Sequence, residues 1–211
     1  MTEVYHRCIQ ASKEEIYLAC EGFIDEHQKY LLQLIQKDID QTQKLIDELS
    51  ERIGNLLAPY DNAVERLKEI PGLSTKVVED LIAEIGLDME VFPTEKNLAS
   101  WAGMSPGNNE SAGKKSSRTN HGNKQVKSIM TEAAWAATRT KDTFYNARYH
   151  KVAARRGKKR ALIAVGHSIL TSVWHVLHDN VSYNELGAEY LTKRIALKRK
   201  EYLERELERR L

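Results

Sequence analysis

The chain has few cysteines and no long apolar run. Its two cysteines, Cys8 and Cys20, have neither the spacing of metal ligands nor the pattern of a disulfide framework, which fits a reducing cytoplasm. No run of 18 apolar residues is present, and residues 1–7 lack the apolar core of a signal peptide. The sequence therefore predicts a cytoplasmic protein without a membrane span.

Prolines are also few, and all four lie within one part of the chain, at Pro59, Pro71, Pro93 and Pro106. Because proline ends or kinks a helix, the flanking regions can form long helices while the middle is divided into short ones. No segment alternates apolar and polar residues convincingly enough for a strand. The sequence predicts an all-α fold, with a long N-terminal coiled-coil helix followed by a helical domain.

Residues 14–62 are predicted to form the coiled-coil unit. Apolar residues recur there every seven positions, with a second series three positions later, so that one stripe lasts about four heptads. Such a stripe needs a partner helix, either from another copy of the chain or from the charged C-terminal helix at 191–211. The alternative is one long helix lying on the globular part. The first series is Leu32, Ile39, Ile46, Ile53 and Tyr60, and the second is Ile35, Thr42, Leu49 and Leu56.

Residues 63–190 are predicted to form the helical domain. Within it, 64–87 reads as two helices separated by Pro71-Gly72, with Ser74 capping the second helix and Gly86 ending it. This pattern resembles the helix-hairpin-helix element of DNA-handling proteins, whose turn offers backbone amides to phosphate. Similar helix pairs also occur without a ligand. Further along, Thr94 is expected to begin a short helix that carries Leu98 and Trp101 inward.

The charge distribution is strongly uneven. Residues 113–160 contain 14 Lys or Arg against only Glu132 and Asp142, a net charge of +12, so the remainder carries −10 in a chain of +2. A basic block on an otherwise acidic protein indicates a polyanion partner, and nucleic acid is the default. The alternative, a merely solubilising helix face, is disfavoured by the near-absence of counter-charges.

A Gly-, Ser- and Asn-rich loop at 103–123 precedes an Ala-rich helix that begins near Asn123. The loop places Ser111 close to Lys114, Lys115 and Arg118, and a hydroxyl beside cations suits binding of, or attack on, a phosphate. By itself such a loop is more often a solvated connection. The residues predicted to contact DNA are Gly72, Lys76, Gly113, Lys114, Lys115, Arg118, Lys124, Lys127, Arg155, Arg156, Lys158, Lys159 and Arg160.

Several ordered motifs over residues 20–190 resemble the C-terminal domain of a bacterial transposase family, the insertion-sequence 110/1111 group guided by a bridge RNA. The resemblance implies that Ser111 is the nucleophile, attacking a DNA phosphodiester and holding the strand as a phosphoserine. The motifs are Ile70-Pro-Gly-Leu, Gly103-Met-Ser-Pro, Ser111-Ala-Gly-Lys, His121-Gly-Asn-Lys, Lys159-Arg-Ala-Leu-Ile-Ala-Val-Gly-His and Trp174-His-Val-Leu-His-Asp.

Two departures from the family pattern lie beside Ser111. Ala112 stands where glycine is frequent, and Glu110 adds a negative charge, which leaves Ser116 and Ser117 as fallback candidates. No metal site is predicted, since His150, His167, His175 and His178 lack partners at ligand spacing and read as packed or surface residues.

Family members begin with a ribonuclease-H-like domain that carries an Asp-Glu-Asp-Asp metal site. This chain begins instead with the coiled coil, so we expect a truncated reading frame or an excised piece, inactive alone, with Mg²⁺ and a guide RNA belonging to the full-length protein. The competing hypothesis is a non-catalytic DNA-binding and dimerising module, as a remnant or regulator of the transposase. A more distant one is a helix-hairpin-helix accessory protein of DNA repair.

Overall fold

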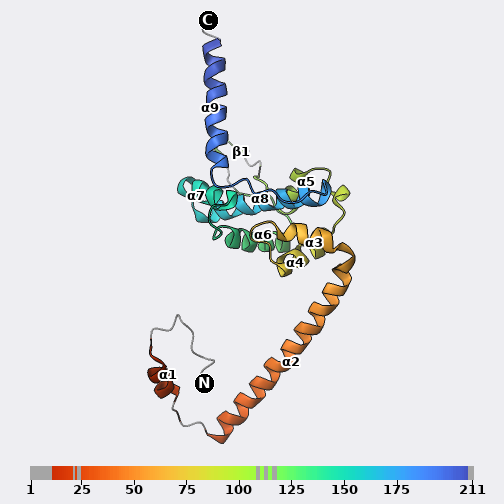
Figure 1. The fold of residues 1–211 in the computed structure, drawn as a ribbon, viewed down its shortest axis with the longest axis vertical. Helices are drawn as coiled ribbons and strands as arrows, with labels where there is room; N and C mark the ends of the chain where they lie inside the picture. Colours follow the sequence, from red (N-terminus) through yellow and green to blue (C-terminus); the bar gives the residue numbers. More distant parts are fainter. Residues whose placement is uncertain are drawn as a thin grey trace. The chain divides into compact units, whose positions relative to one another are not determined.

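The computed structural model describes residues 11–20, 22, 25–107, 110–111, 114–115 and 118–208 (Figure 1). The prediction of an all-α fold is confirmed, because the described residues are overwhelmingly helical and their one β element is a hairpin of two two-residue strands. The chain divides into two compact units, 1–56 and 57–211. The helices are α1 (Lys13–Cys20), α2 (Glu26–Leu57), α3 (Asp61–Lys68), α4 (Thr75–Ile85), α5 (Glu95–Trp101), α6 (Lys124–Ala137), α7 (Phe144–Arg156), α8 (Lys158–His178) and α9 (Tyr190–Glu208).

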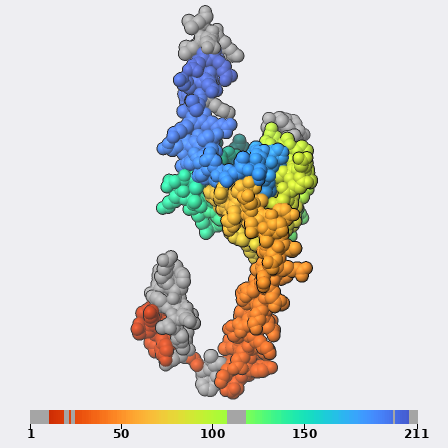
Figure 2. Space-filling view, turned by 45° about the vertical axis from the view of Figure 1, so that its right-hand side comes forward, coloured from red at the N-terminus to blue at the C-terminus, as the bar shows by residue number. Residues whose placement is uncertain are grey.

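The first unit consists mainly of α2, a helix about 48 Å long at 1.5 Å per residue. It begins with a reciprocal cap, in which Gln28 N donates to Asp25 Oδ1 (2.7 Å) and Asp25 N donates to Gln28 Oε1 (3.1 Å). None of its residues is buried, and the predicted heptad side chains are open to solvent, Ile39 to 55% and Leu56 to 66%. Figure 2 shows this helix in orange as an uncovered rod. The long helix is confirmed, and its pairing into a coiled coil stays a prediction.

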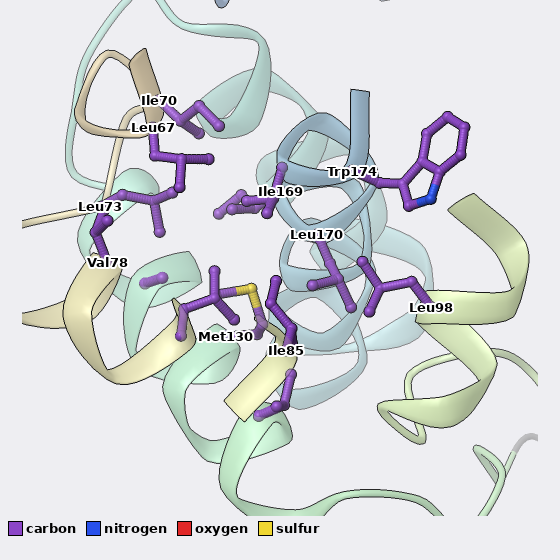
Figure 3. Close-up of a cluster of buried hydrophobic side chains, with 14 of the residues drawn as sticks. Leu67, Ile70, Leu73, Val78, Ile85, Leu98, Met130, Ile169, Leu170 and Trp174 are labelled. Atoms are coloured by element: carbon purple, nitrogen blue, oxygen red, sulfur yellow. The ribbon is translucent and has the colours of Figure 1, made fainter. Parts of the chain in front are cut away.

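The core of the second unit is built around α8, which packs against α3, α5, α6 and α7. Figure 3 shows apolar side chains of α3, α4, α5 and α6 meeting beside Ile169 and Leu170 of α8. Trp174 Nε1 donates to the carbonyl of Phe92 (2.9 Å), which fixes α8 to the segment before α5. By length and composition α8 could cross a membrane, but eight of its residues are buried in this core, and the core helix of a globular domain passes the same test.

The predicted boundaries of the α3–α4 pair agree with the structure. Leu73 N donates to the carbonyl of Ile70 (3.1 Å), which closes a turn with Pro71 and Gly72 at its centre, the arrangement of a type II turn. Ser74 caps α4 by accepting from Val77 N, and Gly86 ends the helix with a positive φ of 72°. Short-range turn chemistry therefore sets both ends of α4.

Gly72 has a packing reason to be glycine. Its φ is +93°, and a Cβ added to it would lie 2.3 Å from the carbonyl oxygen of Ala133 and 2.9 Å from the Cβ of Ala137, both on α6. The turn thus rests directly on the backbone of α6. This contact orders the α3–α4 pair against the helix that follows the serine loop.

The helix α5 begins as predicted but presents Trp101 differently. Thr94 caps it by accepting from Asn97 N, and Leu98 is fully buried. Trp101 is 39% exposed and packs at 5.3 Å, ring to ring, on Phe92. The expectation that Trp101 points inward was therefore wrong, because it is the last residue of a seven-residue helix whose buried face is already filled by Leu98 and Ala99.

Candidate nucleic-acid interface

The segment predicted as a polar loop is an antiparallel β-hairpin. Gly107 N donates to the carbonyl of Arg118 (2.8 Å), and Pro106 is bridged to Thr119. Farther along, strand β1 (Glu110–Ser111) pairs with strand β2 (Lys114–Lys115), with Ser111 opposite Lys114. The residue numbers of all the described pairs fit one antiparallel register. Ser111 belongs to one of these backbone pairs, with Lys114 as its partner.

The base of the hairpin is closed by two glycines. A Cβ on Gly122 would lie 2.2 Å from Gly103 N and 2.4 Å from the carbonyl oxygen of Trp101. Asn123 N donates to that same carbonyl (2.9 Å), and the Asn123 side chain caps α6 by accepting from Gln125 N and Val126 N. The close crossing of the two arms, which glycine alone permits, starts the hairpin and α6 at one point.

A groove of about 690 Å³ lies where the hairpin base meets the α7–α8 pair. The two helices are joined by Gly157 alone, whose φ of +83° turns the chain back on itself. Helical spacing then puts residues i, i+4 and i+8 on the facing sides. The groove is lined by Met104, Pro106 and Thr119 from the hairpin base, Arg148, Val152 and Arg156 from α7, and Lys159, Arg160, Ile163, Ala164 and His167 from α8.

Four cations line this groove. Three of them, Arg156, Lys159 and Arg160, are exposed and cluster at the α7–α8 turn. Arg148 is half-buried at the other end, where its Nε donates to the carbonyl of Ala164 (3.4 Å). Burial lowers the pKa of Arg148, Tyr145 acts in the opposite direction, and the nearby Arg194 lowers it again, but a guanidinium keeps its charge at neutral pH. The groove therefore attracts anions.

His167 lies beside Arg148 at the inner end of the groove, the end away from the α7–α8 turn. Burial lowers the pKa of His167, and the positive charge of Arg148 lowers it further, whereas Glu95 acts weakly in the opposite direction. The ring is accordingly neutral at pH 7, with one N–H that can donate and one nitrogen that can accept.

Sequence reasoning placed neither Arg148 nor His167 at the site. The spacing of Arg148, Val152 and Arg156, and that of Lys159, Ile163 and His167, was present in the sequence. That spacing becomes informative only when α7 and α8 are known to face each other.

The other predicted contact residues are distributed around the domain. Lys76 on α4 and Lys124 in the first turn of α6 are exposed. Lys127 is half-buried, and its Nζ donates to Thr119 Oγ1 (2.7 Å), so that it braces the hairpin base. Arg118 is exposed on the returning arm of the hairpin. Each of these remains a prediction as a DNA contact.

The remaining predicted DNA contacts either do not line the groove or are only partly described by the structure. Arg155 and Lys158 are exposed at the α7–α8 turn but do not line the groove. Gly113, Ser116 and Ser117 lie outside the described residues, and for Ser111, Lys114 and Lys115 the structure describes only the backbone pairing. Phosphate binding at Gly72 stays a prediction. The amide of the next residue, Leu73, is already bonded within the turn.

Among the described residues, no three His, Cys, Asp or Glu side chains come together as a possible metal site. His175 and His178 both bond Asp179, with Nδ1–Oδ distances of 2.7 Å each. The described residues thus offer no donor set suited to Mg²⁺.

Residues 64–150 match the sequence model of the family described as Transposase IS116/IS110/IS902 family. The matched segment is about two fifths of the chain; it begins within α3, ends within α7, and includes the hairpin and the groove residues Met104, Pro106, Thr119 and Arg148. No curated protein sequence matches the chain significantly. The family match supports a transposase role and the resemblance noted from the motifs.

Proposed function

We propose that the second unit is the DNA-binding, serine-bearing part of an insertion-sequence transposase. The observation that carries the proposal is the hairpin, whose base borders a groove lined by four cations and whose strands pair Ser111 with Lys114. The hairpin and Arg148 fall within the segment that matches a transposase family, whereas Arg156, Lys159 and Arg160 lie just beyond its end. DNA is the polyanion that a transposase acts on.

The cations of the groove would contribute affinity for the DNA backbone rather than recognition of the base sequence. Arg156, Lys159 and Arg160 lie on one exposed turn, where they can reach successive phosphates of a DNA backbone. Contacts of this kind orient the DNA along the α7–α8 pair. The hairpin base, braced by the bond from Lys127 to Thr119, would then hold Ser111 near the bound backbone.

The chemistry proposed for Ser111 is transesterification. Its Oγ attacks the phosphorus of a phosphodiester, a new P–Oγ bond forms, and the bond from phosphorus to the leaving strand's oxygen breaks. The serine proton is given up, and the leaving oxygen takes up a proton. Because the phosphate stays in ester linkage, attack by another strand's hydroxyl reverses the step and joins the DNA. Cations near the tip offset the phosphate charge that would repel the attacking oxygen.

Partners complete the proposal. Mg²⁺ would be held by a ribonuclease-H-like domain outside the described residues, and a guide RNA would select the DNA. The apolar stripe of α2 would pair with the same stripe of a second copy, since its side chains are exposed to solvent. The isolated chain is then expected neither to cleave nor to join DNA, although it carries the nucleophile.

Covalent trapping tests the chemistry. The chain is combined with a ribonuclease-H-like domain and guide RNA of the same family, and with a DNA nicked so that the short leaving strand diffuses away. We expect a DNA–protein adduct whose DNA-bearing peptide contains Ser111, and its loss in Ser111→Ala with unchanged DNA binding. Ser105→Ala, at the hairpin base, is the matched control and keeps the adduct.

Other outcomes would overturn parts of this assignment. An adduct that persists in Ser111→Ala, or that maps to Ser116 or Ser117, would remove Ser111 from the reaction. Absence of an adduct in the complete mixture would favour the non-catalytic DNA-binding and dimerising module.

A further inference from the structure

The centre of the groove is apolar, although its ends are charged. Val152, Ile163 and Ala164 form the middle of the two helical walls, and Met104 and Pro106 face them from the hairpin base. The cations alone are enough to bind the phosphates of a nucleic-acid backbone. The apolar centre would contribute nothing to such binding. It gains free energy when it covers the apolar face of a ligand, and in a nucleic acid such faces belong to bases and sugars.

The size of the groove excludes a double helix. A volume of about 690 Å³ accommodates a ligand of a few tens of atoms, whereas duplex DNA is a convex rod whose base faces are covered by stacking. An unpaired nucleotide presents both a bare base face and a phosphate. Guanidinium planes also stack on unpaired bases, and Arg148 and Arg156 flank the apolar centre.

The distance between the two charged ends of the groove matches the length of a short piece of single-stranded nucleic acid. Lys159 and His167 are two turns apart on α8, or about 12 Å at 1.5 Å per residue. A phosphate at Lys159 and Arg160, an apolar base or sugar over Ile163, and a polar edge at Arg148 and His167 would fill that length. Neutral His167 can donate to a base or phosphate oxygen at the inner end.

Ser111 is not required to react at the groove itself. Ser111 lies five residues beyond Pro106, a span that reaches up to about 17 Å when extended. That reach allows Ser111 to attack a phosphate other than the one held at the groove.

We propose that the groove between the hairpin base, α7 and α8 holds an unpaired nucleotide of the DNA strand, a short distance along that strand from the phosphodiester that reacts. The proposal rests on the proposed function in that the ligand is DNA and that Ser111 reacts with the same strand. It adds that this part of the DNA is single-stranded when bound. Strand exchange requires unpaired strands, and the groove would keep one of them in place.

The test compares oligonucleotides of one sequence, single-stranded and duplex, by fluorescence anisotropy at matched salt with the whole chain. We expect single strands to bind more tightly, and Val152→Gln to weaken that binding about tenfold while changing duplex binding less than twofold. Val91→Gln is the matched control, because Val91 is 68% exposed and does not line the groove. Its affinities should equal those of the wild type.

Two results would overturn the inference. One is equal affinity for single-stranded and duplex DNA, and the other is a Val152→Gln variant that melts like the wild type and binds single strands as tightly. Either result leaves duplex binding and the Ser111 adduct untouched, so failure here is distinguishable from failure of the proposed function. Thermal melting of both Gln variants verifies that each is folded.

Discussion

Single glycines decide the geometry around the hairpin and its supporting helices. Gly103 and Gly122 cross at a separation that no side chain would allow, and Gly72 rests on the backbone of α6. Glycine has no side chain that could contact DNA, so these residues act through the backbone alone. Their effect is to fix where the hairpin starts and how α3 and α4 lie against α6.

Gly72 and Gly86 offer a test at this scale, because both have positive φ but only Gly72 is crowded. Alanine at either position costs about 1–3 kcal/mol of backbone strain. At Gly72 the new Cβ also meets the carbonyl of Ala133, which adds about 1–3 kcal/mol of overpacking. Denaturant unfolding followed by circular dichroism should therefore show a larger loss of stability for Gly72→Ala than for Gly86→Ala. Equal losses would mean that the turn does not rest on α6.

Individual elements were predictable from the sequence to different degrees. The ends of α4, α5 and α6 follow from local signals, since Ser74, Thr94 and Asn123 each accept a backbone N–H of their own first turn. These bonds join residues two or three positions apart. A pattern of residue types is therefore enough to find them.

The hairpin and the groove could not be predicted in the same way. The arms of the hairpin do not alternate apolar and polar residues, because both are polar, and their register is visible only in the pairing of Pro106 with Thr119 and of Ser111 with Lys114. The groove depends on which helices are neighbours. A neutral, half-buried His167 beside Arg148 is a product of that packing.

The element α2 carries its own prediction. If its apolar stripe pairs with a second copy, Ile39→Asp together with Ile46→Asp will place four charges in the dimer seam, lower the helical content and reduce the sedimentation mass. The matched control is Gln33→Asp with Gln41→Asp, which adds the same charges outside the stripe and should leave the mass unchanged. Wild type and seam variant sedimenting alike as monomers would show that α2 does not pair.

At the scale of the whole molecule, charge is segregated along the chain. The block from 113 to 160 holds +12 while the remainder holds −10, and the fold brings part of that block, from Arg148 to Arg160, to one groove. Segregation of this kind favours binding of a polyanion to one region and repels it from the rest. The acidic remainder would keep DNA from lying on the chain at random.

The central claim is that the exposed cations of the α7–α8 turn contact DNA phosphates, and the salt dependence of duplex binding tests it most directly. Each phosphate contact contributes about −0.9 to the slope of log K against log salt concentration. Lys159→Gln with Arg160→Gln should therefore make the slope shallower by about 1.8 and weaken binding. Lys37→Gln with Lys44→Gln removes the same charge from exposed positions of α2 and should leave the slope unchanged. A slope equally steep in the wild type and in the Lys159 and Arg160 variant would contradict the claim.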